Sequence, residues 1–290
     1  RGGKGIRTFS PGGTARRRKG RSKDMYRLIA LDIDDTITLN PRVVPNEIIE
    51  AVRKAKEHGI HVTVATGRGW LGSKLIIDQL GITDPVINYG GAMVTDPRTG
   101  RALHAHEIPP ELVTEVLGEA KTLGIHAHIY QGDKVIAEEP NPYVEGYAEK
   151  LDLPCEYDPD IMKKTWYNVP KVLMMTTDEK AQRLIPEFQK KHAGKLKVSG
   201  SSKGFIEFNN PDSHKGAGLE WVAGYLGIAQ KDTVAVGDNS LDLEMIRWAG
   251  LGCAVDNGKP EVKEAADLVI PSCADFGVAR LIECIINGKV

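Results

Sequence analysis

Three carboxylates end a short apolar run near the start of the chain. The run Leu28-Ile29-Ala30-Leu31 leads into Asp32, Asp34 and Asp35. Such a run is typical of a buried strand in a parallel sheet, and open α/β sheets bind ligands at the carboxyl ends of their strands. Side chains alternate along a strand, so Asp32 and Asp34 should share a face. Two close carboxylates need a cation or a shared proton, which indicates an active site. An acidic turn that caps a helix remains the alternative.

Three further polar clusters stand at the ends of predicted strands or the starts of predicted helices. They are Thr66-Gly67-Arg68, Lys215, and the segment Gly237-Asp238-Asn239-Ser240-Leu241-Asp242. Carboxylates at neighbouring strand ends form an oxygen site that suits Mg²⁺, which keeps water and substrate phosphate as its other ligands. The hydroxyl of Thr66 and the ammonium of Lys215 add donors for a phosphate. Each cluster alone is an ordinary turn or helix start, but together they predict a phosphoryl-binding site.

Strands and helices alternate in the segments that must position these residues. Residues 45–59 have helical periodicity between Pro45 and Gly59, and strands are expected near 60–66 and 85–88 with a helix between them. The same rhythm returns from residue 213 to the end of the chain. This pattern predicts a doubly wound, mostly parallel α/β sheet that is interrupted once.

The interruption, residues 91–209, has a different pattern. Strands are expected near 104–108, 125–130, 134–137, 171–175, 196–198 and 204–208, and helices near 110–123, 143–151 and 179–192. Strands joined by turns, with helices between them, predict an antiparallel sheet covered on one face by helices. We therefore expect an inserted α+β domain.

One strand of the insertion alternates between polar and apolar side chains. Its polar residues, His126, His128 and Tyr130, resemble a metal site, but a sheet face exposed to solvent is the expected interpretation. Glu207, on a later strand, is a candidate for bonding between the insertion and the core.

The composition is that of an ordinary globular protein. The chain has 290 residues, of which 41% are hydrophobic and 27% charged, and no apolar run approaches the roughly 18 residues that span a bilayer. The four cysteines show neither CxxC spacing nor a dense framework, so reduced thiols without a zinc site are expected. A cytoplasmic protein without membrane partners is the expectation.

Charge is distributed unevenly along the chain. Residues 1–24 carry nine basic residues and one acidic residue, whereas the remainder is acidic. A vector-derived remnant is the first interpretation of this Gly/Arg-rich tail, and a native arm that binds nucleic acid is the second. The acidic body argues against nucleic acid as the main partner.

Together, the clusters resemble the four motifs of the haloacid dehalogenase superfamily of phosphohydrolases. The resemblance rests on Asp32-Ile33-Asp34-Asp35-Thr36, Thr66-Gly67-Arg68, Lys215 and the segment 237–242. The insertion, with Val86-Ile87-Asn88-Tyr89-Gly90-Gly91-Ala92 and Ile206-Glu207-Phe208, is similar to the Cof-type subfamily with an α/β cap. The resemblance covers the chain from about residue 26 onward. It implies a Rossmann-like catalytic core of residues 25–90 and 210–290, and a cap of residues 91–209.

The resemblance also implies the catalytic and metal-binding roles. Asp32 would be the nucleophile that attacks phosphorus and becomes a transient aspartyl phosphate. Asp34 would protonate the leaving alcohol and then activate water. Mg²⁺ would bind Asp32, the backbone carbonyl of Asp34, and Asp238.

Other residues would bind the phosphate or support the site. Thr66, Gly67 and Lys215 would hold the transferring phosphoryl group as charge spreads over its oxygens. Asp242 would position Lys215 or a metal-bound water, with Asn239 as a further supporting residue.

Four residues are less defined. Arg68 is expected to contact substrate or to form a structural salt bridge, and Asn88 to face the substrate. Asp35 replaces the Gly that commonly precedes the motif Thr, and either a loop cap or a contact with the leaving group would explain it. Leu241 replaces an Asn that is often found in Cof-type proteins, which removes an amide donor near the phosphate.

The expected function is therefore a Mg²⁺-dependent phosphatase that acts on a small phosphorylated metabolite, such as a sugar phosphate. A sugar phosphomutase on the same scaffold is one alternative. Nucleic-acid binding through residues 1–24 is another.

Overall fold

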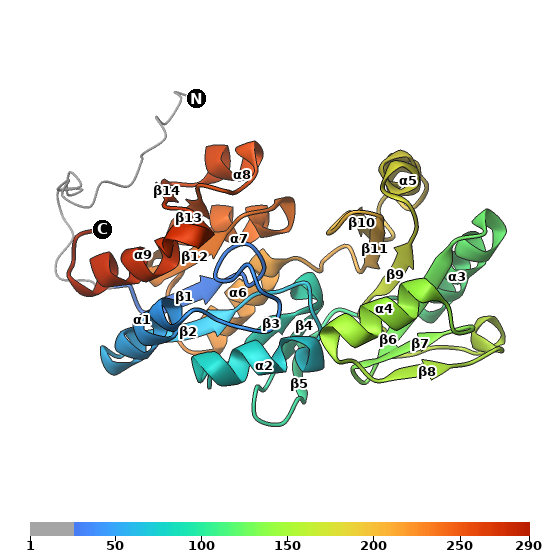
Figure 1. Ribbon diagram of the computed structural model, residues 1–290, viewed down its shortest axis with the longest axis horizontal. Helices are drawn as coiled ribbons and strands as arrows, with labels where there is room; N and C mark the ends of the chain where they lie inside the picture. Colours follow the sequence, from blue (N-terminus) through green and yellow to red (C-terminus); the bar gives the residue numbers. More distant parts are fainter. Residues whose placement is uncertain (1–25) are drawn as a thin grey trace.

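A computed structural model of the chain describes residues 26–290 (Figure 1). The predictions for the basic tail, residues 1–24, lie outside the described residues. None of the described helices has the length and apolarity needed to cross a membrane.

The core is a parallel sheet with helices on both faces. Its strand order is β14-β13-β12-β1-β2, with β1 (Leu28–Leu31), β2 (His61–Val64), β12 (Thr233–Gly237), β13 (Leu251–Val255) and β14 (Leu268–Ile270). Alternate residues of the buried strands face opposite sides, so both faces need a cover. One cover consists of α1 (Asn46–Glu57), α2 (Trp70–Leu80) and α9 (Gly277–Ile286). The other consists of α6 (Lys215–Tyr225), α7 (Leu243–Trp248) and α8 (Pro260–Ala265). This confirms the predicted doubly wound α/β core.

A small antiparallel sheet extends the core. It consists of β3 (Val86–Asn88), β4 (Met93–Thr95) and β5 (Ala102–Ala105). A parallel bridge between Ala65 and Ile87 connects β3 to the chain just after β2, but the partner of β3 on its other side is antiparallel β4. The predicted division of the chain after residue 90 falls between β3 and β4, which pair with each other. The division into domains stays a prediction.

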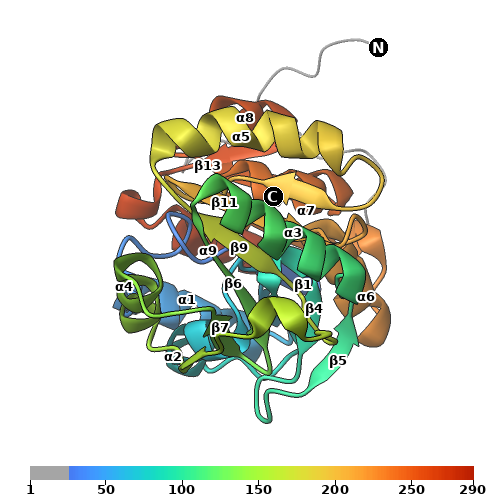
Figure 2. The same cartoon turned by 90° about the vertical axis from the view of Figure 1, so that its right-hand side faces the viewer.

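The inserted segment builds a second sheet, as the sequence predicted, and this sheet has six strands. The strand predicted near 104–108 corresponds instead to β5 of the small sheet. The order of the six strands is β10-β11-β9-β6-β7-β8, with β6 (His126–Gln131), β7 (Lys134–Ala137), β8 (Cys155–Tyr157), β9 (Val172–Met175), β10 (Lys197–Ser199) and β11 (Phe205–Asn209). Every neighbouring pair is antiparallel except β7 and β8. Helices α3 (Pro110–Leu123) and α5 (Asp178–Lys191) pack on one face, and Figure 2 shows α3 in front of β9, with α5 above it. We call this six-stranded sheet and the helices that pack on it the cap.

The polar face of β6 is buried, which corrects the expectation of a solvated face. Helix α4 (Pro142–Leu151) covers it, so His128 and Tyr130 are almost completely buried. The Tyr130 hydroxyl donates to the Tyr147 hydroxyl (2.6 Å), and His126 stacks on Tyr143. Aromatic side chains of α4 therefore occupy the space that the sequence interpretation assigned to water.

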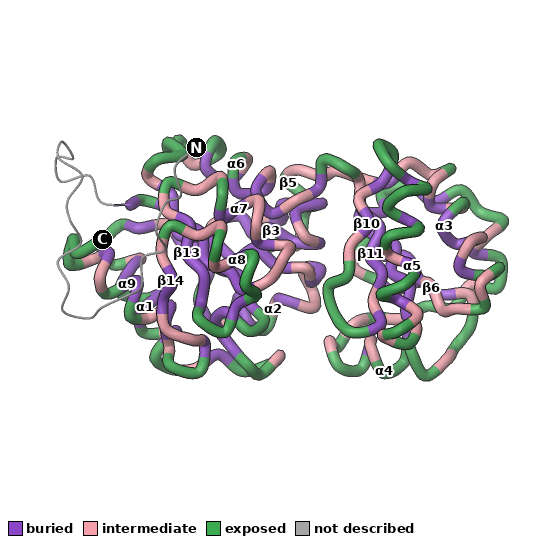
Figure 3. The backbone as a smooth tube through the Cα atoms, turned by 90° about the horizontal axis from the view of Figure 1, so that it is seen from above, coloured by how far each residue is buried: buried purple, intermediate pink, exposed green. Residues whose placement is uncertain are grey.

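The cap lies beyond the carboxyl ends of the core strands. In Figure 1, β1 points toward the cap, and Figure 3 shows a buried interior in both bodies. The two chain crossings run side by side: Asn210 Nδ2 donates to the carbonyl of Glu107 (2.9 Å), and Ser213 Oγ to that of His106 (3.4 Å). The cap is thus placed over the edge at which the candidate site residues were predicted.

Candidate active site

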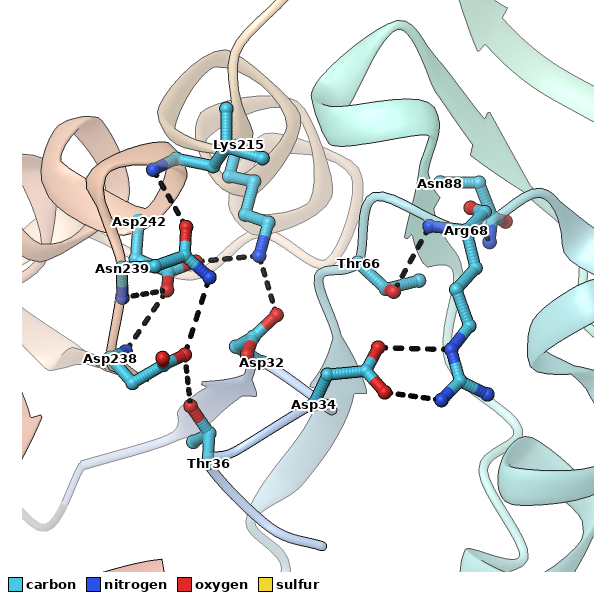
Figure 4. Close-up of polar contacts among 11 residues, drawn as sticks. Asp32, Asp34, Thr36, Thr66, Arg68, Asn88, Lys215, Asp238, Asn239 and Asp242 are labelled. Atoms are coloured by element: carbon cyan, nitrogen blue, oxygen red, sulfur yellow. Dashed lines mark hydrogen bonds and ion pairs between the residues drawn. The ribbon is translucent and has the colours of Figure 1, made fainter. Parts of the chain in front are cut away.

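A buried lysine joins two of the predicted carboxylates. Lys215 is the first residue of α6 and is 1% exposed. Its Nζ donates to Asp32 Oδ1 (2.6 Å), just after β1, and to Asp242 Oδ1 (2.5 Å), after β12 (Figure 4). Neighbouring strands β1 and β12 end at the same edge of the sheet, which brings these residues together.

Asp238 completes the cluster at the end of β12. Its Oδ1 accepts from Thr36 Oγ1 (3.1 Å) and from Asn239 Nδ2 (3.3 Å). The second oxygen of Asp242 accepts the backbone N–H groups of Asp238 and Asn239, both at 3.0 Å. Gly237 makes this turn possible, because a Cβ there would lie 2.4 Å from that of Asp242. Asp242 therefore supports the loop and contacts Lys215.

The charges of this cluster do not balance. Burial, and next the Asp242 carboxylate, raise the pKa of Asp32 well above its usual range. The same two causes raise the pKa of Asp238 to about 6. Burial alone would lower the pKa of Lys215, but the carboxylates of Asp242 and Asp32 outweigh it and raise that pKa. Three carboxylates thus share one ammonium, which favours a further positive charge.

The residues fit a hard divalent cation. Ligand oxygens of Asp32, Asp238 and Asp242 all lie within 4.8 Å of one another. Oδ2 of Asp32 is buried without a hydrogen-bond partner among the described residues. An oxygen-only donor set with an unpaired carboxylate oxygen is what Mg²⁺ binds.

Asp34 and Arg68 form a separate pair. Arg68 Nε donates to Asp34 Oδ2 (3.0 Å), and Arg68 Nη2 contacts the other carboxylate oxygen. The Arg68 side chain is 7% exposed, whereas that of Asp34 is 53% exposed. The strand ends at Leu31, so Asp34 does not stay beside Asp32: Figure 4 shows the two carboxylates directed at different partners. Of the two expectations for Arg68, a substrate contact or a structural salt bridge, the structure contains the salt bridge, with Asp34.

Thr66, after β2, and Asn88, the last residue of β3, both contact Arg68. Thr66 is buried, and its Oγ1 accepts from the N–H of Arg68 (3.1 Å). Asn88 is fully buried, and its Nδ2 donates to the Arg68 carbonyl (3.2 Å) and to Ser73 Oγ (3.0 Å). The Asn88 amide therefore supports the loop that follows β2, and a contact of Asn88 with substrate stays a prediction.

The two departures from the family pattern have local explanations. Asp35 has a φ of 61°, a left-handed conformation that Gly adopts freely and that Asp tolerates better than most residues. Its carbonyl accepts from Asn257 Nδ2 (2.8 Å). The N–H of Leu241 donates to Asn239 Oδ1 (2.9 Å), so this position contributes to the turn through its backbone.

Three residues near the site were not predicted from the sequence. Lys171 of the cap is 1% exposed and donates to the carbonyl of Gly67 (3.1 Å). Asp133 of the cap and Tyr89 of the core are hydrogen bonded to each other. Asp133 lies in the turn between the strands predicted near 125–130 and 134–137, and no local pattern indicated what its carboxylate would contact.

Comparisons with known proteins agree with this geometry. The family model of the haloacid dehalogenase-like hydrolases matches residues 29–282. YxeH of Bacillus subtilis is 29% identical over 274 residues, which cover 91% of this chain and 100% of YxeH. The B. subtilis 5-amino-6-(5-phospho-D-ribitylamino)uracil phosphatase YitU is 25% identical and covers 88% of this chain and 96% of YitU.

A solved structure is similar over nearly the same length. The crystal structure of a haloacid dehalogenase-like hydrolase from Bacteroides thetaiotaomicron has a TM-score of 0.81 and 26% identity. The match covers 90% of this chain and 99% of that one.

Proposed function

The chain belongs to the haloacid dehalogenase-like hydrolases and is a phosphatase, and we propose that it hydrolyses a sugar or polyol phosphate through an aspartyl phosphate, with Mg²⁺ as its cofactor. The observation that carries this proposal is the buried Lys215 between Asp32 and Asp242, beside an unpaired oxygen of Asp32. The name of the relative YitU, which acts on a phosphorylated ribityl compound, supports the substrate class.

Asp32, the backbone carbonyl of Asp34, and Asp238 would hold the metal. When bound, Mg²⁺ offsets the repulsion between the carboxylates and the phosphate dianion. The raised pKa values of Asp32 and Asp238 support this assignment, because both groups would gain from a nearby cation.

The reaction proceeds in two displacements. Asp32 attacks phosphorus through Oδ2, and the bond from phosphorus to the leaving alcohol breaks. Asp34 gives its proton to that alcohol and then takes one from water, which attacks phosphorus and releases phosphate and the Asp32 carboxylate. Asp34 must leave Arg68 for these transfers, and its half-exposed side chain has room to turn.

Thr66, Gly67 and Lys215 hold the phosphoryl oxygens in this proposal. The Thr66 hydroxyl and the Lys215 ammonium donate to oxygens on which charge develops. Asp242 and Asn239 keep Lys215 and the Asp238 loop in place through the contacts described above.

A substrate screen with a matched variant tests the proposal. Phosphate release is measured from a panel of sugar and polyol phosphates with Mg²⁺ or with EDTA. We expect activity only with metal, and a loss of about a thousandfold or more in Asp32→Asn, since the nucleophile is removed. Asp160→Asn, at an exposed aspartate of the cap bonded to Lys163, is the control and should keep full activity.

The intermediate can be detected directly. Acid quenching during turnover, followed by mass spectrometry, should find a phosphoryl group on the peptide that contains Asp32. Unchanged activity in Asp32→Asn would overturn the mechanism. Conversion of one sugar phosphate into an isomer without free phosphate would favour the phosphomutase instead.

The cellular location is part of the same proposal. All four cysteines are free thiols, which is typical of proteins in a reducing compartment and supports the cytoplasm.

A further inference from the structure

The cap holds both ends of the segment Gly67–Trp70, which follows Thr66 and carries Arg68. At the first end, Lys171 Nζ donates to the carbonyl of Gly67 (3.1 Å). At the second, Asp133 Oδ1 accepts from the N–H of Trp70 (3.2 Å). Two cap residues 38 positions apart in the sequence thus converge on one short segment of the core.

Asp133 supplies a helix cap that the core lacks. The N-cap position of α2 is Gly69, which has no side chain to accept the first N–H groups. A carboxylate is favoured there by the helix dipole. Asp133 reaches it from the β6–β7 turn, where Gly132 and Asp133 have φ values of 56° and 63°. A β-hairpin turn of this kind favours Gly, Asn and Asp, so an aspartate fits the turn and its carboxylate is available to accept from α2.

Tyr89 of the core connects the two contacts. Its hydroxyl donates to Asp133 Oδ1 (2.5 Å), and its ring packs edge to face on Tyr130 of the cap at 5.3 Å between centroids. The ammonium of Lys171 lies 5.9 Å from the same ring. Tyr89 has a φ of 51°, which is rare for a bulky side chain and is found where the surrounding structure imposes it.

Gly69 leaves the space that these side chains need. A Cβ at this position would lie 2.3 Å from the Tyr89 hydroxyl oxygen and 2.9 Å from Asp133 Oδ1. Its φ of −70° and ψ of 175° are open to any residue, so alanine there would block the contact without straining the backbone.

Residues of the cap fix the orientation of the Lys171 side chain. Glu207 Oε1 accepts from Lys171 Nζ (3.1 Å) and from Ser201 Oγ (2.7 Å). Both Lys171 and Glu207 are nearly completely buried, so the ammonium has its counter-charge within the cap. Glu207 was predicted as a candidate for bonding between the two bodies, and it reaches the core through Lys171.

We propose that Asp133 and Lys171 are positioning residues of the phosphatase: when the cap closes, they order the segment Gly67–Trp70 and thereby place Thr66 and Arg68. The proposal rests on the proposed function for the phosphate-binding role of Thr66. Opening of the cap would break both contacts, since each joins a cap residue to the core backbone. The first N–H group of α2 would then lose the carboxylate of Asp133 as its acceptor.

Hydrogen exchange tests the ordering without any substrate. The probe is the exchange rate of the Trp70 amide in the full chain, in Asp133→Ala and in Gly69→Ala. We expect at least tenfold faster exchange in both. Asp152→Asn is the control, because Asp152 also joins the cap to the core, through an exposed ion pair with Arg42 at 3.6 Å, and Asn tolerates its left-handed φ of 55°; it should leave the rate unchanged.

Kinetics test the coupling to the reaction. With para-nitrophenyl phosphate as substrate and inorganic phosphate as inhibitor, Asp133→Ala and Lys171→Met should lower kcat at least tenfold and weaken inhibition by phosphate. Asp133→Asn keeps an acceptor oxygen, so it should keep most of the parent kcat and most of the inhibition by phosphate. A merely structural role would lower Tm and leave kcat and phosphate inhibition at the values of the control.

The outcomes separate this proposal from the proposed function. Unchanged Trp70 exchange in both variants, or faster exchange with unchanged kcat and phosphate inhibition, would overturn the positioning role while the phosphatase stands. A full chain without metal-dependent phosphatase activity would overturn the proposed function, whatever the exchange rates.

Discussion

At the scale of single residues, the Asp35 position shows why a family pattern favours glycine and how this chain departs from it. The left-handed φ of 61° is strained for most side chains. Asp tolerates this conformation better than most residues, and the backbone of Asp35 is held by its N–H, which donates to the carbonyl of Thr38 (2.9 Å). The backbone conformation of Asp35 therefore explains the preference for Gly without any contact to the leaving group.

This explanation predicts the order of two substitutions. Asp35→Gly should change the free energy of unfolding by less than about 1 kcal/mol, since Gly adopts the observed φ freely. Asp35→Val should lower it by about 1–3 kcal/mol, because a β-branched residue is strained there. Urea unfolding of the two variants measures both. A valine variant as stable as the glycine variant would contradict the assignment of Asp35 to loop conformation.

Sequence patterns placed some site residues better than others. Asp32, Lys215, Asp238 and Asp242 could be brought together because each stands at a strand end or helix start, and parallel strands share an edge. The burial of Asn88 could not be predicted, since a strand-end amide can face either the open site or the loop beside it.

Asp133, Lys171 and Tyr89 escaped the sequence interpretation for a different reason. Their partners in these contacts lie between 44 and 104 residues away in the sequence, and the contacts exist only where the cap meets the core. No periodicity or spacing in the sequence indicates which cap residues contact the core.

At the scale of elements, the β6 strand shows what alternation can and cannot predict. The period of two correctly separated His128 and Tyr130 from Ile129, which packs under α3 and α5. It does not say what covers each face, and α4 covers the polar one. The strands β4 and β8 were not predicted, and each has only three residues, which is too short for alternation alone to identify a strand.

Burial of this face predicts acid sensitivity of the cap. Burial lowers the pKa of His126 to about 4, and burial, His126 and Lys171 lower that of His128. The unfolded chain, with a histidine pKa of about 6.5, therefore binds more protons, so the stability present above about pH 6.5 is lost as pH falls toward 4. His126 alone should cost about 2 kcal/mol between about pH 7.5 and about pH 5.

Unfolding at both pH values measures this cost. His126→Gln and His128→Gln should each lose less stability between the two pH values than the parent chain, because Gln takes up no proton. His58→Gln, at an exposed histidine of the core, is the control and should lose as much as the parent. Equal losses in all four proteins would show that the buried histidines do not carry the acid sensitivity.

At the scale of the whole molecule, two kinds of contact join the cap to the core. Asp133, Tyr89 and Lys171 make the buried contacts described above. Arg42 with Asp152 is an exposed pair at 3.6 Å, and Lys197 with Glu244 is a partly exposed pair at 3.7 Å. Exposed pairs contribute about 0–1 kcal/mol, whereas hydrogen bonds to buried charged groups contribute about 1.5–3 kcal/mol. The buried set should therefore determine whether the cap stays closed.

Salt separates the two sets of contacts. Raising NaCl from about 0.1 M to about 1 M shortens the Debye length from about 10 Å to about 3 Å, which weakens exposed pairs and leaves buried ones almost unchanged. We expect the radius of gyration from small-angle X-ray scattering to be the same at both concentrations. Tyr89→Ala, which removes the ring and hydroxyl that face the cap, should increase it at either concentration. If the radius of gyration of the parent chain at about 1 M NaCl equals that of Tyr89→Ala at about 0.1 M NaCl, the exposed ion pairs hold the cap closed, because screening weakens those pairs and leaves the buried contacts almost unchanged.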